Sequence, residues 1–505
     1  KQKLRFNYGL SEKQLMNYID LELIIPEISM ALLAGLIIVF DLFSSNKRLL
    51  VPLCLIGLLV PLFFCIAAAQ ESAEAGFMGT MQVDDFSIFF KYVIILATAL
   101  VILSSATYAK RFDNHQGEYY SLILLSATGM MLLASATELI TIYIALELTA
   151  LPTAALAAFI REKKSAESGM KFLILSAVSS AVLLYGMVLL YGFTGSTHLS
   201  DIGTAIATQL SGSAGITDHG VLLFSVILIT AGFGFKISAV PFQMWAPDVY
   251  EGAPTPITAF LSVASKAVGF AIILRILYMV FENEALSSDW TSMMAVLSAI
   301  SMSVGNLIAI KQNNIKRMLA YSTIAQAGYI MVGLAAMTSD TTLNTSGPVG
   351  ILVYLAGYTF TNLAAFAVIT AVSESSGDDS IDSFSGLIKK SPILAGIMTI
   401  SMISLIGIPP TIGFMAKIYI FGAAVETNLT WLAFVGVINS VISAYYYLRV
   451  VKTMFLNSAS EQSPIKPSIG PLSAAVISIV GTVAFGLYPR PIIELAREAI
   501  STIVG

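Results

Sequence analysis

Four ionisable side chains lie deep inside apolar stretches of this sequence, where they could take up and release protons. They are Glu147, Lys236, Lys266 and Lys417. A lysine at the centre of a bilayer costs roughly 2.5–3.5 kcal/mol, and membrane proteins retain such residues mainly along ion or substrate paths. Burial disfavours the charged forms of lysine and glutamate, so both can exchange a proton near neutral pH. Their types and depth therefore favour a proton path.

Lys236 and Lys266 flank a polar, proline-rich turn within the stretch 231–266. A carboxylate that approaches a lysine stabilises its ammonium, and a carboxylate that moves away promotes loss of the proton. A Glu–Lys pair with two separations would act as a switch, and a series of lysines would act as a relay. A sodium site would need several oxygen ligands in one cavity, and lysines would repel the cation. Protons are therefore favoured over sodium.

Other charged side chains in the apolar runs lie nearer their ends. Lys91 and Lys171 lie within a turn or two of an end, where a lysine can extend its ammonium to the headgroups. For Lys171, a role beside the deep residues is an equal alternative. Arg275 stays charged at any working pH, so we expect an ion-pair partner or electrostatic fixture. Three acids are expected at helix ends or at the membrane interface: Glu27, Asp41 and Glu138.

The composition requires a membrane to surround these residues. Of 505 residues, 56% are hydrophobic and only 11% are charged, whereas a soluble domain is nearer half apolar and a quarter charged. The apolar residues fall in runs of about 20, the length that crosses a hydrocarbon core about 30 Å thick. No alternating strands that would form a barrel are evident. We therefore predict an all-α, polytopic membrane protein.

The apolar runs predict fourteen membrane spans, with an error of a few residues at each boundary. They lie near 22–44, 49–69, 85–107, 119–136, 138–160, 168–192, 220–241, 257–280, 291–310, 318–337, 348–373, 391–422, 428–456 and 470–488. The last two long runs, 391–422 and 428–456, exceed a straight crossing, so breaks, tilt or overhang are expected.

Loop charges predict the orientation. If loops are numbered by the spans that they join, the odd loops hold all the loop lysines and arginines, such as Lys47, Arg161 and Lys311, and the even loops hold acids. The positive-inside rule places the odd loops in the cytoplasm and both termini outside. The full set of fourteen spans favours a bacterial inner membrane. The basic N-terminal tail is an exception to this pattern.

The chain also shows weak internal repetition. Spans four to eight and nine to thirteen form two five-helix blocks, and the second block enters the membrane inverted because five is odd. The fourth helix of each block is expected to be broken and to carry a lysine, which points to a transport site. The residues expected at the breaks are Gly232, Gly234, Pro241, Pro409 and Pro410. The predicted divisions are 1–118 (tail and three peripheral helices), 119–280, 291–456 and 457–505.

Several other classes of function have little support. The net charge of −4 disfavours nucleic acid as a partner. Cys54 and Cys65 are expected to be buried apolar filler. His115, His198 and His219 all fall in expected loops, so a metal or haem site is not expected. The GFG at 232–234 lacks the later glycine of a dinucleotide-binding motif.

Four stretches carry a resemblance to a known family. KISAVPFQMWAPDVYEGAPTPITAFLSVASK, NIKRMLAYSTIAQAGY, LIGIPPTIGFMAK and IYIALELTALPTAAL resemble the antiporter-like subunits of respiratory complex I. Of the three types, the L-type is expected to continue into a lateral helix, and the M-type usually has glutamate where Lys417 stands. Both tend to carry histidine where this chain reads FLSVASK. The resemblance therefore favours the third type.

The resemblance implies a role for each deep residue. Glu147 and Lys236 would form the switch pair, Lys266 the central relay and Lys417 the lysine nearest the exit, with Lys171 beside the pair. It also implies a proton-translocating subunit without an active site or cofactor of its own. Flavin (FMN), iron–sulfur clusters and quinone would belong to other subunits, and M-type and K-type subunits would be the neighbours in the bilayer.

Two alternatives remain open at this point. One is a subunit of a multisubunit cation/proton antiporter or of a membrane-bound hydrogenase, although such subunits resemble the L- and M-types more. The other is a stand-alone carrier of an organic solute, which would need a pocket of aromatic and polar groups at mid-membrane.

Overall fold

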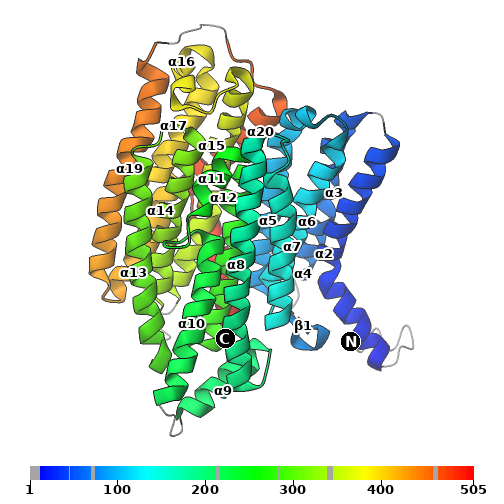
Figure 1. The fold of residues 1–505 in the computed structure, drawn as a ribbon, viewed down its shortest axis with the longest axis vertical. Helices are drawn as coiled ribbons and strands as arrows, with labels where there is room; N and C mark the ends of the chain where they lie inside the picture. Colours follow the sequence, from blue (N-terminus) through cyan, green and yellow to red (C-terminus); the bar gives the residue numbers. More distant parts are fainter. Residues whose placement is uncertain are drawn as a thin grey trace.

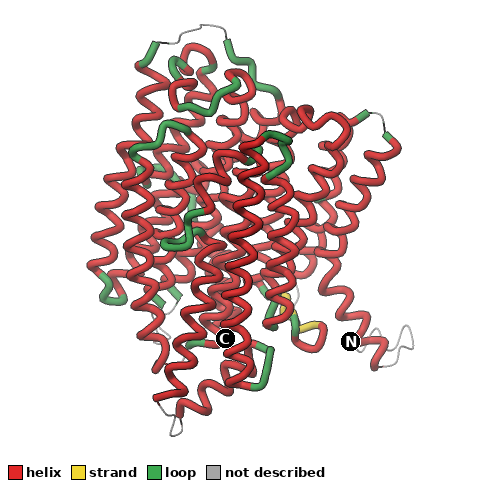
Figure 2. The backbone as a smooth tube through the Cα atoms, viewed as in Figure 1, coloured by secondary structure: helices red, strands yellow, loops and turns green. Residues whose placement is uncertain are grey.

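Long helices lying side by side form nearly the whole protein (Figures 1 and 2). The computed structural model describes residues 12–44, 46–69, 74–211, 216–282, 284–337, 345–458 and 464–504. The helices of the first half are α2 (Glu12–Phe43), α3 (Leu50–Gly57), α4 (Leu59–Ala68), α5 (Asp85–Tyr108), α6 (Gln116–Ser135), α7 (Leu139–Ala157), α8 (Lys163–Thr194), α9 (Leu199–Ser211), α10 (Ile216–Ile237), α11 (Trp245–Gly252) and α12 (Thr255–Val280).

The second half continues in the same style. Its helices are α13 (Glu284–Ala309), α14 (Ile315–Ala335), α15 (Ser346–Ser376), α16 (Leu387–Lys390), α17 (Pro392–Ile406), α18 (Ile412–Glu426), α19 (Thr430–Leu456), α20 (Ile469–Leu487) and α21 (Arg490–Val504). Short 3-10 turns are η1 (Lys47–Leu49), η2 (Phe77–Gly79), η3 (Ala109–His115) and η4 (Ile381–Phe384). One small antiparallel hairpin pairs β1 (Glu74–Gly76) with β2 (Met81–Val83), with Glu74 opposite Val83.

The all-helical, polytopic architecture predicted from composition is confirmed. Within the described residues, twelve segments are long and apolar enough to cross a membrane. One of them, Asp85–Ser135, contains both α5 and α6, and the 15-residue helices α17 and α18 are each shorter than a crossing. The count of fourteen, the inverted repeat and the four divisions of the chain stay predictions. His219 lies in the first turn of α10 rather than in a loop, which corrects that expectation.

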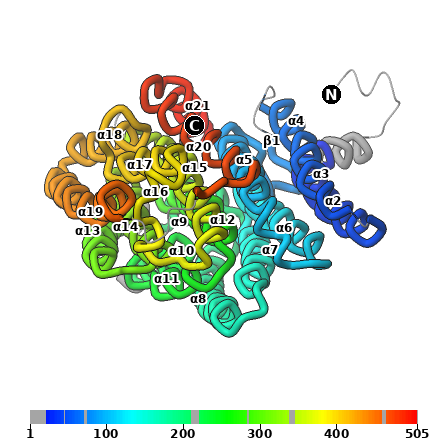
Figure 3. The backbone as a smooth tube through the Cα atoms, turned by 90° about the horizontal axis from the view of Figure 1, so that it is seen from above, coloured from blue at the N-terminus to red at the C-terminus, as the bar shows by residue number. Residues whose placement is uncertain are grey.

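Helix α12 is the innermost element of the bundle. Its most apolar stretch is 100% buried, whereas that of α8, on the outside, is 28% buried. Seen from above, α2, α3 and α4 lie together at one edge of the molecule, beside α5 and α6 (Figure 3). Because α12 carries Lys266, the most enclosed helix is also one that carries a charged side chain.

Two helices are interrupted in the same way. Helix α10 ends at Ile237 and is followed by a non-helical segment, 238–244; helix α17 ends at Ile406 and is followed by another, 407–411. The first residue of each segment, Ser238 or Gly407, has a positive φ, of 60° or 92° respectively. Pro241 and Pro410 each lie three residues further on and follow a cis peptide bond.

The glycines before the first break do not form it. Gly232 and Gly234 lie inside α10, which continues to Ile237, so the prediction that they mark the break is wrong. They are instead sites of close packing, since a Cβ at Gly232 would lie 2.5 Å from the Leu183 side chain and one at Gly234 would lie 2.6 Å from the Phe242 ring. Pro409 lies beside Pro410 in the second non-helical segment.

Candidate functional site

The three deep lysines are enclosed by the helix bundle. Lys236, Lys266 and Lys417 are 7%, 2% and 5% exposed. Their ammonium groups therefore need partners inside the protein, because an unpaired buried charge is costly. The two helix breaks supply those partners for two of the three lysines.

Lys266 reaches the first break from the neighbouring helix α12. Its Nζ donates a hydrogen bond of 2.7 Å to the carbonyl oxygen of Ile237, the last residue of α10. The last carbonyls of a helix have no partner within the helix and carry a partial negative charge, which favours a cation there. The broken helix therefore provides an electrostatic partner for an ammonium group inside the membrane.

Lys417 has the corresponding position at the second break. Its Nζ donates to the carbonyl oxygens of Ile406 at 2.8 Å and Leu405 at 3.2 Å, and to Ser440 Oγ at 3.0 Å. The ammonium also lies 4.3 Å from the centre of the Tyr329 ring, within reach of a cation–π interaction. Both breaks thus present the end of a helix to a buried lysine.

Lys236 precedes the first break and has a different environment. No side-chain hydrogen bond of its ammonium is found among the described residues. Lys236 lines a small cavity with the hydroxyl-bearing residues Ser176, Ser179 and Ser180. The space open to the centre of a water molecule is about 20 Å³, and about 10–15 Å³ is enough for one water. The serines and such a water could solvate the ammonium.

Glu147 on α7 is half-buried and near this lysine, but not in contact with it. Its carboxylate is the charged group that acts on Lys236 through space, and no ion pair between the two is found in the described part of the chain. The two residues expected to form a switch pair are therefore not in direct contact in this structure.

A network of uncharged polar side chains surrounds Lys417, and the sequence reading missed it. Gln326 donates to the Leu405 carbonyl at 3.2 Å, which is the same oxygen that Lys417 contacts, and to the Tyr447 hydroxyl at 3.2 Å. The Tyr354 hydroxyl donates to the Gln326 side chain. The sequence did contain an indication of this network, namely a glutamine and several tyrosines inside apolar runs. Burying such polar side chains costs free energy unless they are hydrogen-bonded.

Lys171 lies in a half-exposed cluster of charged side chains. Its ammonium pairs with Asp248 at 2.6 Å and Glu167 at 2.8 Å, and 40% of its side chain is exposed. Arg317 bridges Asp248 and Glu251, at 2.7 and 2.8 Å. Burial raises the pKa of Asp248, but the hydrogen bonds from Lys171 and Arg317 outweigh it and leave that pKa below its ordinary value.

Lys91 does not extend to the headgroups. It is 1% exposed and its ammonium forms an ion pair of 2.7 Å with Glu27, which is equally buried. The predictions of a snorkelling Lys91 and an interfacial Glu27 are wrong, because the two side chains, one from α2 and one from α5, reach each other inside the bundle. Asp41 pairs with Lys47 at 2.8 Å two residues before the end of α2, and Glu138 caps the start of α7 through Thr141 N.

Arg275 forms an ion pair, which is one of the two roles expected for it. Its guanidinium forms two hydrogen bonds of 3.0 Å with the Asp84 carboxylate, and both side chains are buried. Asp84 is also the residue that caps α5. This pair therefore joins α12 to the start of α5.

Cys54 and Cys65 are free and buried, which confirms the prediction that they fill apolar space in the core.

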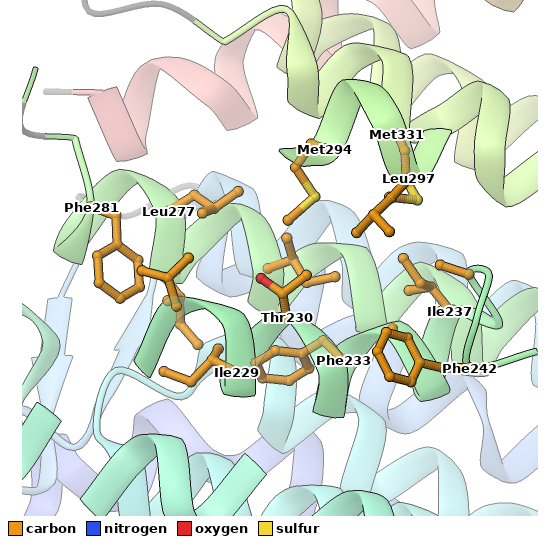
Figure 4. Close-up of a pocket in the computed structure, with 15 residues that line it drawn as sticks. Ile229, Thr230, Phe233, Ile237, Phe242, Leu277, Phe281, Met294, Leu297 and Met331 are labelled. Atoms are coloured by element: carbon orange, nitrogen blue, oxygen red, sulfur yellow. The ribbon is translucent and has the colours of Figure 1, made fainter. Parts of the chain in front are cut away.

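An apolar cavity adjoins the first break on a side away from the serines that surround Lys236. Its walls come from α10, α12, α13, α14 and the break itself, and Thr230 carries the only oxygen among the side chains labelled in Figure 4. Lys236 is not among the residues that line it. Such a cavity lacks the polar groups that would orient an organic solute.

The family of the chain follows from its sequence as a whole. Residues 136–443, which include both breaks and all the deep ionisable residues, match the model of the NADH:quinone oxidoreductase/Mrp antiporter transmembrane family. The chain belongs to this family. Within the described residues, no group of three or more His, Cys, Asp or Glu side chains is placed to hold a metal ion.

Individual members of this family cover nearly the whole chain. NADH-quinone oxidoreductase subunit N of Dehalococcoides mccartyi is 43% identical over 487 residues, which are 96% of this chain and 100% of the relative. A chain in the structure of respiratory complex I from Thermus thermophilus with bound Aureothin has a TM-score of 0.77 at 29% identity, covering 94% of this chain and 99% of its own length. These findings confirm the resemblance seen in the sequence, and the third type is the one named subunit N.

The same fold occurs outside complex I. A chain of the Mrp complex from Dietzia sp. DQ12-45-1b has a TM-score of 0.83 at 21% identity, covering 96% of this chain and 98% of its own length. At this identity the likeness concerns the fold alone.

Proposed function

We propose that this chain is the proton-translocating membrane subunit of an NADH–quinone oxidoreductase. Protons move along a buried series formed by Glu147, Lys236, Lys266 and Lys417, driven by redox chemistry in other subunits. The observation that carries the proposal is that Lys266 and Lys417 are both buried and both hydrogen-bonded to the last carbonyl of a broken helix. A charge placed there is stabilised yet removable, as a relay requires.

The subunit itself has no catalytic role in this proposal. FMN, iron–sulfur clusters and quinone belong to other subunits, and the neighbours are M-type and K-type subunits in a bacterial inner membrane. The odd loops face the cytoplasm and both termini face outward. The 43% identity to a subunit N favours this assignment over an antiporter or hydrogenase subunit, for which the Mrp likeness supplies the fold only.

The test replaces Lys417 by alanine in the complete complex, reconstituted in lipid vesicles. Proton uptake or release per NADH oxidised should fall, because the relay loses a site. Lys311→Ala, which removes an exposed loop lysine, is the matched control and should pump normally. An unchanged proton-to-electron ratio in Lys417→Ala would count against the proposal.

A further inference from the structure

A large polar cavity lies at the odd-loop end of the molecule. It offers about 870 Å³ of space for water and is lined by residues from five odd-numbered loops and the adjoining helix ends. Arg161, Glu162 and Lys164 line it and are exposed, so it opens to the aqueous phase. Its lining also includes the buried residues Gly252 and Thr255, so the cavity extends to the start of α12.

The lining of the cavity includes an ion pair in which Lys316 is buried and Asp379 is partly exposed. Lys316 lines it, is 4% exposed and pairs with Asp379 at 2.9 Å, while its ammonium also donates to the Ala253 carbonyl at 3.2 Å. Burial raises the pKa of Asp379, but Lys316 and the Ser373 hydroxyl outweigh this and hold that pKa below its ordinary value.

Tyr250 in α11 directly precedes Glu251, which is the first residue of that helix to line the cavity. Its side chain is fully buried, and its hydroxyl has no well-aligned hydrogen bond among the described residues. The groups that this hydroxyl faces are Thr323 on α14 and Tyr358 on α15. A buried hydroxyl without a well-aligned hydrogen bond is costly unless water or a functional role accounts for it.

The residues next to the Tyr250 hydroxyl, Thr323 and Tyr358, adjoin the polar network around Lys417. Thr323 and Tyr358 share a hydrogen bond of 2.9 Å, and Tyr358 lines a small cavity together with Gln326, Tyr354 and Leu405. Gln326 and Lys417 both donate to the Leu405 carbonyl at 3.2 Å. Tyr250 therefore lies between two polar regions: Glu251, the next residue, lines the aqueous cavity, and Thr323 and Tyr358 adjoin the network around Lys417.

We propose that the Tyr250 hydroxyl connects the polar cavity to the network around Lys417 and so admits protons from the odd-loop side. A hydroxyl donates one proton and accepts another. A hydrated proton in the cavity would bind the phenol oxygen while the phenol's own proton passes to the Thr323 or Tyr358 hydroxyl. That hydroxyl releases its own proton in turn, through the small cavity that Tyr358 lines, to the unprotonated amine of Lys417. The phenol is then neutral again, and rotation of its O–H restores the starting state. This inference rests on the proposed function of Lys417.

The first experiment uses Tyr250→Phe in the complete complex, which removes the hydroxyl and retains the buried ring. The proton-to-electron ratio should fall to that of Lys417→Ala. Tyr119→Phe is the matched control, because Tyr119 is also fully buried but bonds Ser105 outside this network. Normal pumping by Tyr250→Phe beside defective Lys417→Ala overturns this route and leaves the proposed function standing. Normal pumping by both variants overturns both proposals.

A second experiment tests the cavity without altering Tyr250. Ala155 is exposed and lines the cavity, so Ala155→Cys accepts a bulky, membrane-impermeant thiol reagent. Cys54 and Cys65 are buried, and the parent complex treated with the same reagent accounts for cysteines elsewhere. Reagent added from the odd-loop side should lower the pumping ratio of the variant relative to the treated parent. Full modification with unchanged pumping contradicts entry through the cavity.

Discussion

The ammonium of Lys266 donates a hydrogen bond of 2.7 Å to the carbonyl oxygen of Ile237, at the end of helix α10. Lys417 forms the equivalent bond of 2.8 Å with Ile406, at the end of α17. In each case the ammonium that would give up a proton also donates a hydrogen bond to a helix-end carbonyl that has no partner within its own helix. Loss of the positive charge weakens that bond, so the charge of the lysine and the conformation of the break are coupled.

Replacing Lys266 by alanine should therefore loosen the first break as well as impair pumping. The Ile237 carbonyl loses its partner, and the amides of 238–244 should exchange with deuterium faster than in the parent complex. Lys417→Ala should accelerate exchange at 407–411 instead. Equal exchange at 238–244 in Lys266→Ala and the parent would show that the lysine does not stabilise the break.

Replacing Lys236 by alanine should lower proton pumping and quinone-coupled NADH oxidation while leaving assembly intact. The side chain lines a cavity beside three serines and makes no direct hydrogen bond in the described structure, so its removal leaves no partner unpaired. Pumping in vesicles and the subunit content of the purified complex are the two measurements. Wild-type pumping by this variant is the result that would exclude Lys236 from the relay.

Replacing Glu147 by glutamine should also impair pumping. The amide retains the size of the side chain but carries no charge, so it cannot alter the proton affinity of Lys236 through space. Glu138→Gln changes a carboxylate on the same helix that caps its first turn, and it should affect stability more than pumping. A normal proton-to-electron ratio in Glu147→Gln would remove this residue from the mechanism.

The sequence predicted those features that depend on local chemistry. Proline has no N–H to continue a helix, so Pro241 and Pro410 located the two breaks. The glycines misled, because Gly232 and Gly234 permit contact with Leu183 and Phe242 inside an intact helix rather than ending it. In a sequence, a glycine can indicate either close packing between helices or a helix break, so the residue type alone does not distinguish the two.

Partners between distant helices were beyond the sequence. Lys91 and Glu27 are 64 positions apart in a chain of 505 residues, and only the three-dimensional structure reveals that they form a pair. Gln326 was overlooked for the same reason, since its partners Tyr354, Leu405 and Tyr447 come from three other helices. The depth of a residue in a span indicates that its polar side chain needs a hydrogen-bond or ion-pair partner, but does not indicate which residue provides it.

The surface cluster around α11 should make stability depend on acid. Burial raises the pKa of Glu251, yet Lys164 and Arg317 outweigh it, so its pKa, like that of Asp248, is below the ordinary value. A lowered pKa adds stability that is complete above the ordinary values, 4.5 and 3.8, and is lost as the pH falls below them. Thermal denaturation in detergent should show this loss, and Arg317→Gln should reduce it. An identical acid dependence in parent and variant would contradict this role of Arg317.

The buried pair of Glu27 and Lys91 should behave as a unit when either residue is changed. Replacing one partner leaves an uncompensated charge and should cost about 3–5 kcal/mol, whereas a well-packed apolar pair should be nearly neutral. Glu27→Gln and Lys91→Met should therefore each lower the thermal stability of the complex in detergent, and the double variant should recover most of the loss. Arg490→Gln breaks an exposed pair with Glu494 and should change little, because water and salt screen the attraction between exposed charges. Additive losses in the double variant would show that the two charges do not stabilise each other, and that α2 is held to the bundle by its apolar contacts alone.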